Sequence, residues 1–261
     1  MKADAMNGEL LISAVDISKK YGAVNAVSRI SLDVYAGGIY GVAGLNGAGK
    51  STLLAILAGV MRPNEGMVYY RGVPVYAGRR RAGALRIGYV PQDIALFPDL
   101  SVKDNLKFWA LTGMSSKRAG AAAQPVRRRI ADAAEAAGLS GHMNKNVRAL
   151  SGGMKRRVNI AAALATNPEV LIMDEPTAGL DVKNRRDILN FIGIMARDRQ
   201  RGLAVICTSH QSGELEMISD RLLLLDRGQA VYDGPPSDVF GGKYSAYNNI
   251  DDILYAMGNK A

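Results

Sequence analysis

The stretch Gly44-Leu-Asn-Gly-Ala-Gly49-Lys50-Ser51 decides the fold. It satisfies the pattern G-x-x-x-x-G-K-[ST], in which a glycine-rich turn joins a buried strand to a helix. Its surroundings fit, because residues 39–43 form an apolar run of strand length and residues 51–57 have a helical pattern that Gly59 ends. This stretch therefore predicts an α/β fold that binds a nucleotide at the junction of strand and helix.

Each residue type in this loop has a physical reason to be there. Glycines let consecutive backbone N–H groups turn inward and surround an anion, and the helix N-terminus adds positive partial charge. Lys50 supplies a full charge between the β- and γ-phosphates of ATP, and the Ser51 hydroxyl is a ligand for Mg²⁺. The predicted nucleotide contacts here are Asn46, Gly47, Ala48, Gly49, Lys50, Ser51 and Thr52.

Two carboxylates follow an apolar strand in the second half of the chain. Val170-Leu-Ile-Met173 precedes Asp174 and Glu175, and α/β folds place ligands at the ends of such strands. An ordinary surface turn has the same appearance, but the phosphate loop in the same chain favours a catalytic site. We expect Asp174 to hold Mg²⁺ and Glu175 to accept a proton from the attacking water.

A second candidate anion site lies far along the chain, in Leu150-Ser-Gly-Gly-Met-Lys-Arg-Arg157. Ser151 can cap the following helix, and Gly152 and Gly153 leave its first amides open to an anion. The pattern also fits a helix that is merely well capped. Because one ATP cannot use both loops of the same molecule, we interpret the second loop as closing on the nucleotide of a neighbouring subunit.

Composition limits the other functions. The 261 residues are 48% hydrophobic, which is typical of a globular protein, and no run approaches the roughly 18–20 apolar residues of a membrane helix. The single cysteine, Cys207, excludes an internal disulfide framework and is expected to be a buried strand thiol. The net charge is +9, and we interpret the basic clusters 79–81 and 127–129 as solvated surface. They lack interleaved aromatic residues, so no specific nucleic-acid partner is expected.

The organisation predicted along the chain is a β-rich start, a helical insertion and an α/β return. Strands at 10–17 and 30–34 are separated by a turn at 19–22, and 68–70 with 73–76 form a hairpin. We place one domain at 9–240, with a helical subdomain inserted at about 93–166, and a short tail at 241–261 that contains a helix at 249–257. The insertion is expected to hold helices at 102–111, opened by Ser101 and Asp104, at 124–138 and at 152–166.

Together these motifs closely resemble the nucleotide-binding subunits of ATP-binding cassette (ABC) transporters, over nearly the whole chain. The loop at 44–51, the signature at 150–157, the segment 170–175 and Pro176-Thr-Ala-Gly-Leu-Asp181 match in order and spacing. The resemblance implies a P-loop NTPase (RecA-like) core sheet flanked by helices, with an antiparallel β subdomain and the helical insertion. Leu45 stands where proline is frequent in the family, and Met154 where glutamine is frequent.

The resemblance also implies roles for residues that the patterns alone do not assign. Tyr21 looks like the aromatic residue that stacks on adenine, and Gln92 like the glutamine that reaches the Mg²⁺ and water region and links to the membrane partner. Asp181 matches an aspartate that communicates across the dimer. His210 looks like the histidine that contacts the γ-phosphate and positions Glu175 and the water.

The function implied by the resemblance is ATP hydrolysis that powers transport through a separate transmembrane permease subunit. The chain would act as a homodimer or with a related cassette, peripherally at the cytoplasmic face of the cell membrane. Segment 97–106 looks like that of ABC-2 exporters. The docking groove is expected around 97–111, where helical spacing favours Phe108 and Trp109 as core rather than docking groups.

Three related functions are weighed against transport. A soluble single-cassette ATPase in cofactor assembly would share every motif and have no membrane partner, so co-purification with a membrane protein discriminates the two. DNA-repair relatives insert a long coiled coil, and translation-acting relatives carry two cassettes in tandem. We expect neither feature in this chain.

Overall fold

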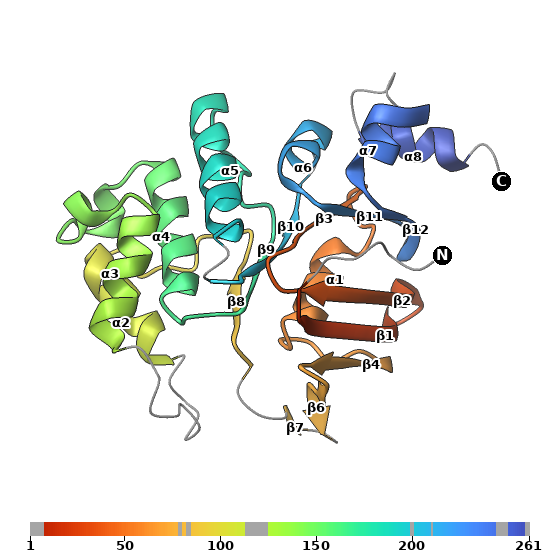
Figure 1. Ribbon diagram of the computed structural model, residues 1–261, viewed down its shortest axis with the longest axis horizontal. Helices are drawn as coiled ribbons and strands as arrows, with labels where there is room; N and C mark the ends of the chain where they lie inside the picture. The colour runs from red at the N-terminus through yellow and green to blue at the C-terminus, as the bar shows by residue number, and fades with distance from the viewer. Residues whose placement is uncertain are drawn as a thin grey trace.

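The computed structural model describes residues 8–77, 80–81, 85–112, 125–198, 201–209, 211–243 and 250–258. Its centre is a six-stranded sheet in the order β12-β11-β3-β10-β9-β8 (Figure 1). All neighbouring strands are parallel except β12, which runs antiparallel to β11. The strands are β3 (Ile39–Gly44), β8 (Ile87–Val90), β9 (Val170–Met173), β10 (Ala204–Thr208), β11 (Arg221–Asp226) and β12 (Gln229–Gly234).

An antiparallel sheet in the order β2-β1-β4-β5 lies beside this core. It contains β1 (Leu10–Tyr21), β2 (Val24–Tyr35), β4 (Glu65–Tyr70) and β5 (Val73–Pro74); β6 (Tyr76–Ala77) pairs separately with β7 (Arg80–Arg81). The hairpin between β4 and β5 is confirmed. The predicted turn at 19–22 was wrong for its first three residues, because Lys19, Lys20 and Tyr21 continue β1 and pair with β2.

Helices cover the core sheet and form a separate group at one side (Figure 1). The group at the side contains α2 (Val102–Thr112), α3 (Val126–Ala136) and α4 (Gly152–Leu164), with short 3₁₀ turns at Ser140–His142 and Val147–Ala149. The others are α1 (Lys50–Leu57), α5 (Val182–Ala196), α6 (Ser212–Ile218), α7 (Pro236–Asp238), a π-helical turn at Val239–Lys243 and α8 (Ile250–Gly258). The helical insertion and the antiparallel subdomain predicted from the sequence are both present.

Local chemistry explains where these helices begin and end. The Ser101 hydroxyl accepts a hydrogen bond from Asp104 N (3.1 Å) and donates one to its carboxylate (2.5 Å), as a cap of α2 should. Helix α1 ends at Gly59, whose φ is 67°. The N–H groups of Gly59 and Val60 donate to the carbonyls of Ile56 and Ala55, which closes the helix in a Schellman motif.

The core lies on both faces of the six-stranded sheet. Successive residues of β9 alternate between two apolar clusters: Leu171 and Met173 face one, while Val170 and Ile172 face the other. Every residue of β9 and β10 is buried, as expected for parallel strands covered on both sides. Helix α8 contributes Ile253 to the first cluster. The domain limits 9–240 and 241–261 stay a prediction.

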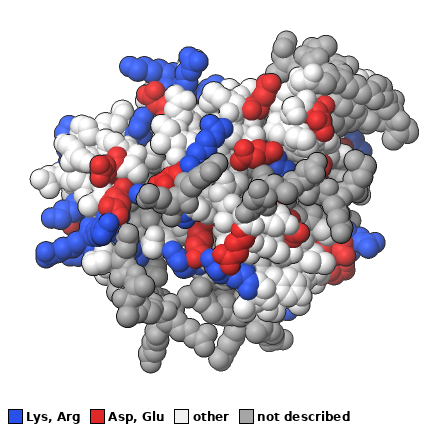
Figure 2. All heavy atoms as spheres, in the orientation of Figure 1, with Lys and Arg blue, Asp and Glu red and all other residues white. Residues whose placement is uncertain are grey.

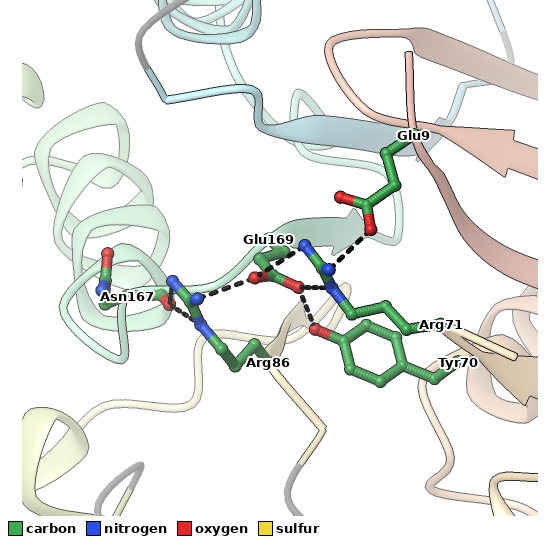
Figure 3. Close-up of polar contacts among 6 residues, drawn as sticks. All are labelled: Glu9, Tyr70, Arg71, Arg86, Asn167 and Glu169. Atoms are coloured by element: carbon green, nitrogen blue, oxygen red, sulfur yellow. Dashed lines mark hydrogen bonds and ion pairs between the residues drawn. The ribbon is translucent and has the colours of Figure 1, made fainter. Parts of the chain in front are cut away.

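An ion-pair network fixes the antiparallel sheet to the core (Figure 3). The Glu169 carboxylate, just before β9, accepts from Arg71 Nε (2.8 Å), from Arg86 (2.7 Å) and from the Tyr70 hydroxyl. Arg71 also pairs with Glu9 (2.7 Å). Burial acts to raise the pKa of Glu169, but hydrogen bonds from Arg71 and Tyr70 and the charges of Arg86 and Arg71 outweigh it and lower that pKa.

Of the two basic clusters, the one at 127–129 departs in one residue from the solvated surface that was predicted. Arg127 and Arg128 are exposed, but Arg129 is buried and donates to the carbonyls of Ala110 (2.9 Å) and Thr166 (3.3 Å). Its position on the inward face of α3 explains the difference. The side chains at 79–81 lie outside the described residues. On the face in Figure 2, basic and acidic side chains are interspersed, without a continuous basic stripe.

Candidate functional site

The phosphate loop lies at the carboxyl end of β3, in the middle of the core sheet. Two glycines are required by space: a Cβ on Gly44 would lie 2.4 Å from the Leu225 carbonyl oxygen, and one on Gly49 would lie 2.0 Å from that of Ala26. Gly49 also has φ 101°, which L side chains rarely adopt. Lys50 is buried, and its ammonium donates to the carbonyls of Gly44 (2.8 Å) and Leu45 (3.0 Å).

The other predicted contacts of this loop surround the start of α1. Asn46 and Ser51 are exposed, Ala48 is buried, and Thr52 is half-buried. Tyr21 lies at the end of β1 with about half of its surface exposed (49%). Its hydroxyl donates to the Met61 sulfur (2.9 Å), and the Lys19 ammonium stands 5.8 Å from its ring centroid.

The two carboxylates lie at the carboxyl end of β9, at the same edge of the sheet as the loop. Asp174 is buried, and its N–H donates to the Val90 carbonyl (2.9 Å), which continues the pairing of β9 with β8. Glu175 follows in a left-handed conformation with φ 48°. The Gln92 amide donates to Glu175 Oε2 (3.1 Å), so two of the predicted catalytic residues are in contact. His210 lies outside the described residues.

Thr208 contacts the Asp174 carboxylate and the Glu175 backbone, and the sequence reasoning missed it. Its hydroxyl is fully buried (0% exposed), accepts from the Glu175 N–H (2.8 Å) and donates to Asp174 Oδ1 (2.8 Å). The parallel register sets Cys207 beside Met173, so the next residues along the two strands, Thr208 and Asp174, meet. A polar residue at the end of the apolar run 204–207 is the sequence signal that could have found it.

The signature loop lies at the start of α4, within the group of helices at the side (Figure 1). Ser151 is the N-cap, and its hydroxyl accepts from Met154 N (3.3 Å), which confirms the predicted cap. Ser151 and Gly152 are exposed, and Gly153 is buried against Asn184 of α5. Among the hydrogen bonds of the described residues, none joins this loop to the phosphate loop, as expected if each serves a different nucleotide.

Asp181 is connected to the signature loop through Asn184. Its carboxylate caps α5, accepting from Asn184 N (2.9 Å) and Asn184 Nδ2 (2.6 Å). Hydrogen bonds from the backbone and side chain of Asn184 lower the pKa of Asp181. A Cβ on Gly153 would lie 2.6 Å from Asn184 Oδ1. Asn184 therefore stands directly between the signature loop and Asp181, a contact that the sequence motifs do not reveal.

Arg156 is the other residue that sequence reasoning missed. It lies on the buried face of α4 and donates to the carbonyls of Pro91 (3.2 Å) and Gln92 (2.7 Å). Burial lowers its pKa. Because the Gln92 side chain contacts Glu175, Arg156 links the signature helix to the segment beside the predicted catalytic carboxylate.

Exposed apolar side chains gather between β8 and the end of α2. Phe108, 42% exposed, packs edge-on against Phe97 with 4.8 Å between ring centroids. Trp109 packs against the core as predicted, whereas the prediction of a core role for Phe108 was wrong, because Phe108 is exposed and packs edge-on against the rings of Phe97 and Trp109. Ile94, Leu100 and Leu111 of the same segment are also exposed, and these three residues with the Phe97–Phe108 pair are termed the apolar ledge.

A cavity of about 260 Å³ lies at the opposite edge of the sheet, before the strands β8, β9 and β10. Arg86 there pairs with Glu169 (2.7 Å), and Arg201 pairs with Asp198 (3.4 Å). Arg129 donates to two backbone carbonyls. These arginines already have acceptors, and the predicted site residues lie elsewhere.

The comparison with known families identifies this arrangement. The sequence profile of the ABC transporter family matches residues 27–178, which include the phosphate loop, the signature loop and both carboxylates. The chain belongs to the ABC transporter ATP-binding family. This cassette is an ATPase subunit of a transporter. In the described part of the cassette, no helix is long and apolar enough to cross a membrane.

Curated relatives include cassettes of several transport systems. The cassette is 37% identical to the linearmycin resistance ATP-binding protein LnrL of Bacillus subtilis, over 88% of this chain and 70% of the relative. It is 38% identical to the methionine import protein MetN of Caulobacter vibrioides, over 88% and 68%. It is also 38% identical to the Nod factor export ATP-binding protein I of Rhizobium etli, over 86% and 68%.

Solved cassettes share the fold over nearly its whole length. CbiO1 of Clostridium perfringens, described as part of the transporter complex cbiONQ, superposes with a TM-score of 0.76 and 26% identity over 96% of this chain and 99% of that one. The cassette MJ0796, solved as a post-hydrolysis dimer bound to ADP and phosphate, gives a TM-score of 0.72 and 26% identity over 87% and 99%.

Proposed function

We propose that two copies of this cassette, or one copy and a related cassette, enclose two ATP molecules and hydrolyse them to drive a membrane permease. The observation that carries the proposal is the separation of two anion-binding helix starts in one chain, at Lys50 of α1 and at Gly152 of α4. Each nucleotide would lie between the phosphate loop of one subunit and the signature loop of the other. MJ0796, which is solved as a dimer bound to ADP and phosphate, supports a dimeric arrangement.

The first half of the site binds the phosphates and the base. Residues Asn46, Gly47, Ala48 and Gly49 present backbone N–H groups to the phosphates, with Lys50 as the charged donor and Thr52 in the first turn of α1. Lys50 would exchange its present carbonyl acceptors for phosphate oxygens, since charge-assisted hydrogen bonds are stronger. Tyr21 would stack on adenine with the ring face that Lys19 does not cover.

The residues present also suit Mg²⁺. Ser51, Asp174 and Gln92 offer hydroxyl, carboxylate and amide oxygens, which are hard ligands of the kind that Mg²⁺ prefers. Among the described residues, no three His, Cys, Asp or Glu side chains cluster as a metal cage, in keeping with an ion held by one carboxylate, water and phosphates. When bound, Mg²⁺ would neutralise charge on the β- and γ-phosphates.

Hydrolysis would depend on Glu175. Its carboxylate takes a proton from the attacking water while the water oxygen bonds to the γ-phosphorus, and the bond from that phosphorus to the β–γ bridging oxygen breaks to release ADP. Gln92 holds Glu175 Oε2 by its amide (3.1 Å) and so orients the base. His210 is proposed to contact the γ-phosphate and to position Glu175 and the water.

The second half of the site comes from the partner subunit. Ser151, Gly152 and Gly153 would direct the first N–H groups of α4 toward the γ-phosphate bound by the neighbouring subunit. Asp181 would communicate the state of the site across the dimer interface. A Glu175→Gln variant should form a dimer in ATP that persists, with almost no turnover. Sedimentation of this variant at increasing ATP tests the proposal, and a species that stays monomeric at saturating ATP would contradict it.

The permease would dock on the apolar ledge, beside Gln92. Contact there couples the state of the ATP site to the membrane subunit and places the cassette peripherally at the cytoplasmic face of the membrane. Export is favoured by the LnrL and Nod factor relatives, although MetN is named for import. Affinity purification from gently solubilised membranes tests this, because only soluble partners would speak for a cofactor-assembly ATPase instead.

A further inference from the structure

We propose that Thr208 is a positioning residue for ATP hydrolysis, whose hydroxyl sets the geometry of both carboxylates at the end of β9. The inference rests on the proposed function of Asp174 and Glu175. It assigns a role to a side chain that no motif in the chain marks, on a strand separate from the one that carries the two carboxylates.

The Thr208 hydroxyl is engaged both as a donor and as an acceptor. Thr208 Oγ1 accepts from the Glu175 N–H (2.8 Å) and donates to Asp174 Oδ1 (2.8 Å). Thr208 has no exposed surface, and Asp174 is almost fully buried (4% exposed). Because these groups are shielded from water, breaking either hydrogen bond would leave a polar group unsatisfied. The two bonds therefore fix the relative positions of Thr208, Asp174 and Glu175.

The backbone of Glu175 has an uncommon conformation. Its φ of 48° is a left-handed conformation that a side chain with a Cβ adopts rarely and only when its surroundings enforce it. Thr208 holds the N–H of this residue, and Gln92 holds its carboxylate oxygen Oε2 (3.1 Å). The two bonds act at opposite ends of Glu175 and together direct its side chain.

The same hydroxyl also orients the Asp174 carboxylate. By donating to Oδ1, Thr208 occupies one carboxylate oxygen and leaves Oδ2 as the oxygen available to Mg²⁺ or its water. Rotation of the carboxylate would exchange these oxygens and move the ligand. Thr208 thus orients the proposed metal ligand and the proposed base through one oxygen atom, and both depend on the pairing of β10 with β9.

The test compares Thr208→Val with Thr208→Ser. Valine keeps the shape and the strand preference of threonine but removes the hydroxyl, whereas serine keeps the hydroxyl and removes the methyl group. For Thr208→Val we expect kcat to fall at least about tenfold, because small displacements of catalytic groups are costly. The Mg²⁺ concentration at half-maximal rate should rise several-fold. Thr208→Ser should keep both values within about threefold of the parent.

Two further readouts do not depend on turnover. The affinity for a fluorescent ATP analogue in EDTA should be the same in all variants within about twofold, because the hydrogen bonds of the Thr208 hydroxyl go to Glu175 and Asp174. Amide hydrogen exchange of the nucleotide-free protein should quicken at Glu175 in the valine variant but not in the serine variant. A residue that only filled space would change unfolding temperature and leave these values alone.

Variants of Lys50 and Glu175 distinguish a failure of the Thr208 role from a failure of the proposed ATP site. If Lys50→Ala and Glu175→Gln abolish turnover while Thr208→Val keeps the parental kcat and Mg²⁺ requirement, the positioning role is wrong and the site stands. If Lys50→Ala and Glu175→Gln retain turnover, the proposed site itself is wrong. Loss of activity in Thr208→Val and Thr208→Ser alike, with normal exchange at Glu175, would also refute the role of the hydroxyl.

Discussion

Replacing Gly152 with alanine should separate folding stability from dimerisation. Gly152 is the first residue of α4, is exposed and does not have positive φ. A Cβ built there meets no heavy atom within 4 Å, so the folded subunit accommodates it without movement. Alanine is up to about 1 kcal/mol more favourable than glycine in a helix, and a gain of that size raises the melting temperature by roughly 2–4 °C.

The same methyl group should weaken the dimer. In the proposed arrangement the space in front of Gly152 belongs to a phosphate of the neighbouring subunit, which must approach the first N–H groups of α4. Loss of one hydrogen bond to a charged group costs about 1.5–3 kcal/mol. A homodimer loses one such bond at each of its two sites, so we expect the ATP-dependent dimer to dissociate roughly a hundred- to ten-thousandfold more readily. ATP binding by the monomer should not change, because Gly152 is remote from the phosphate loop of its own subunit.

The assay is sedimentation in a Glu175→Gln background, which prevents turnover, across a range of ATP and protein concentrations. Gly153→Ala is the matched comparison: its Cβ would lie 2.6 Å from Asn184 Oδ1, so this variant should lose stability as well as dimerisation. A Gly152→Ala protein that melts higher and dimerises as tightly as its parent would refute the reasoning, because no phosphate could then lie against the start of α4.

Three further outcomes are expected. Burial raises the pKa of Cys207 to about 12, whereas an ordinary thiol in urea is roughly one-quarter ionised at pH 8. Alkylation of Cys207 at pH 8 should therefore be at least ~10³-fold slower in the native protein than in urea. Fast labelling of the native protein would contradict this. Because the pKa of Glu169 is lowered from its ordinary value of 4.5, its ionised carboxylate stabilises the fold at pH values above 4.5, and this contribution disappears as the pH falls through the folded-state pKa. Glu169→Gln should therefore be less stable than the parent at pH 7. Urea unfolding curves should show the difference in stability shrinking below about pH 4.5. Arg156→Met removes both hydrogen bonds to the segment at Gln92 and should lower kcat about tenfold with ATP affinity unchanged. The kcat of Arg156→Lys should lie between those of Arg156→Met and the parent. Equal kcat values in all three proteins would exclude a role of Arg156 in orienting that segment.

The elements that local sequence determines were predictable. The glycines and Lys50 predict the turn between β3 and α1. Ser101 and Ser151 predict the starts of α2 and α4. These signals act within a few residues, through caps and allowed backbone angles. Apolar runs of strand length predicted strands of the core sheet. The positions of Gln92, Asp174 and Glu175 at one edge of the sheet followed from the family resemblance and from the rule for parallel strands.

What sequence could not reveal are contacts set by register and by helix rotation. Lys19 and Tyr21 looked like a turn because they are polar and precede a glycine, but pairing with β2 holds them in a strand. Arg129 and Arg156 carry the charge of surface residues, yet each faces inward and donates to backbone carbonyls. Thr208 meets Asp174 only because β10 lies beside β9, which depends on the whole order of the sheet.

The order of the core sheet also bears on synthesis at the ribosome. Strand β3 is made first of the six but lies between β10 and β11, both of which emerge more than a hundred residues later. At 5–20 residues per second, a nascent chain holds β3 without either neighbour for on the order of 10–40 s. Through that interval Gly44 lacks the Leu225 carbonyl that packs against it, and Asp174, once made, still waits for Thr208. We therefore expect a ribosome-bound fragment that ends before β10 to lack ATPase activity, because the site at the ends of β3 and β9 is then incomplete.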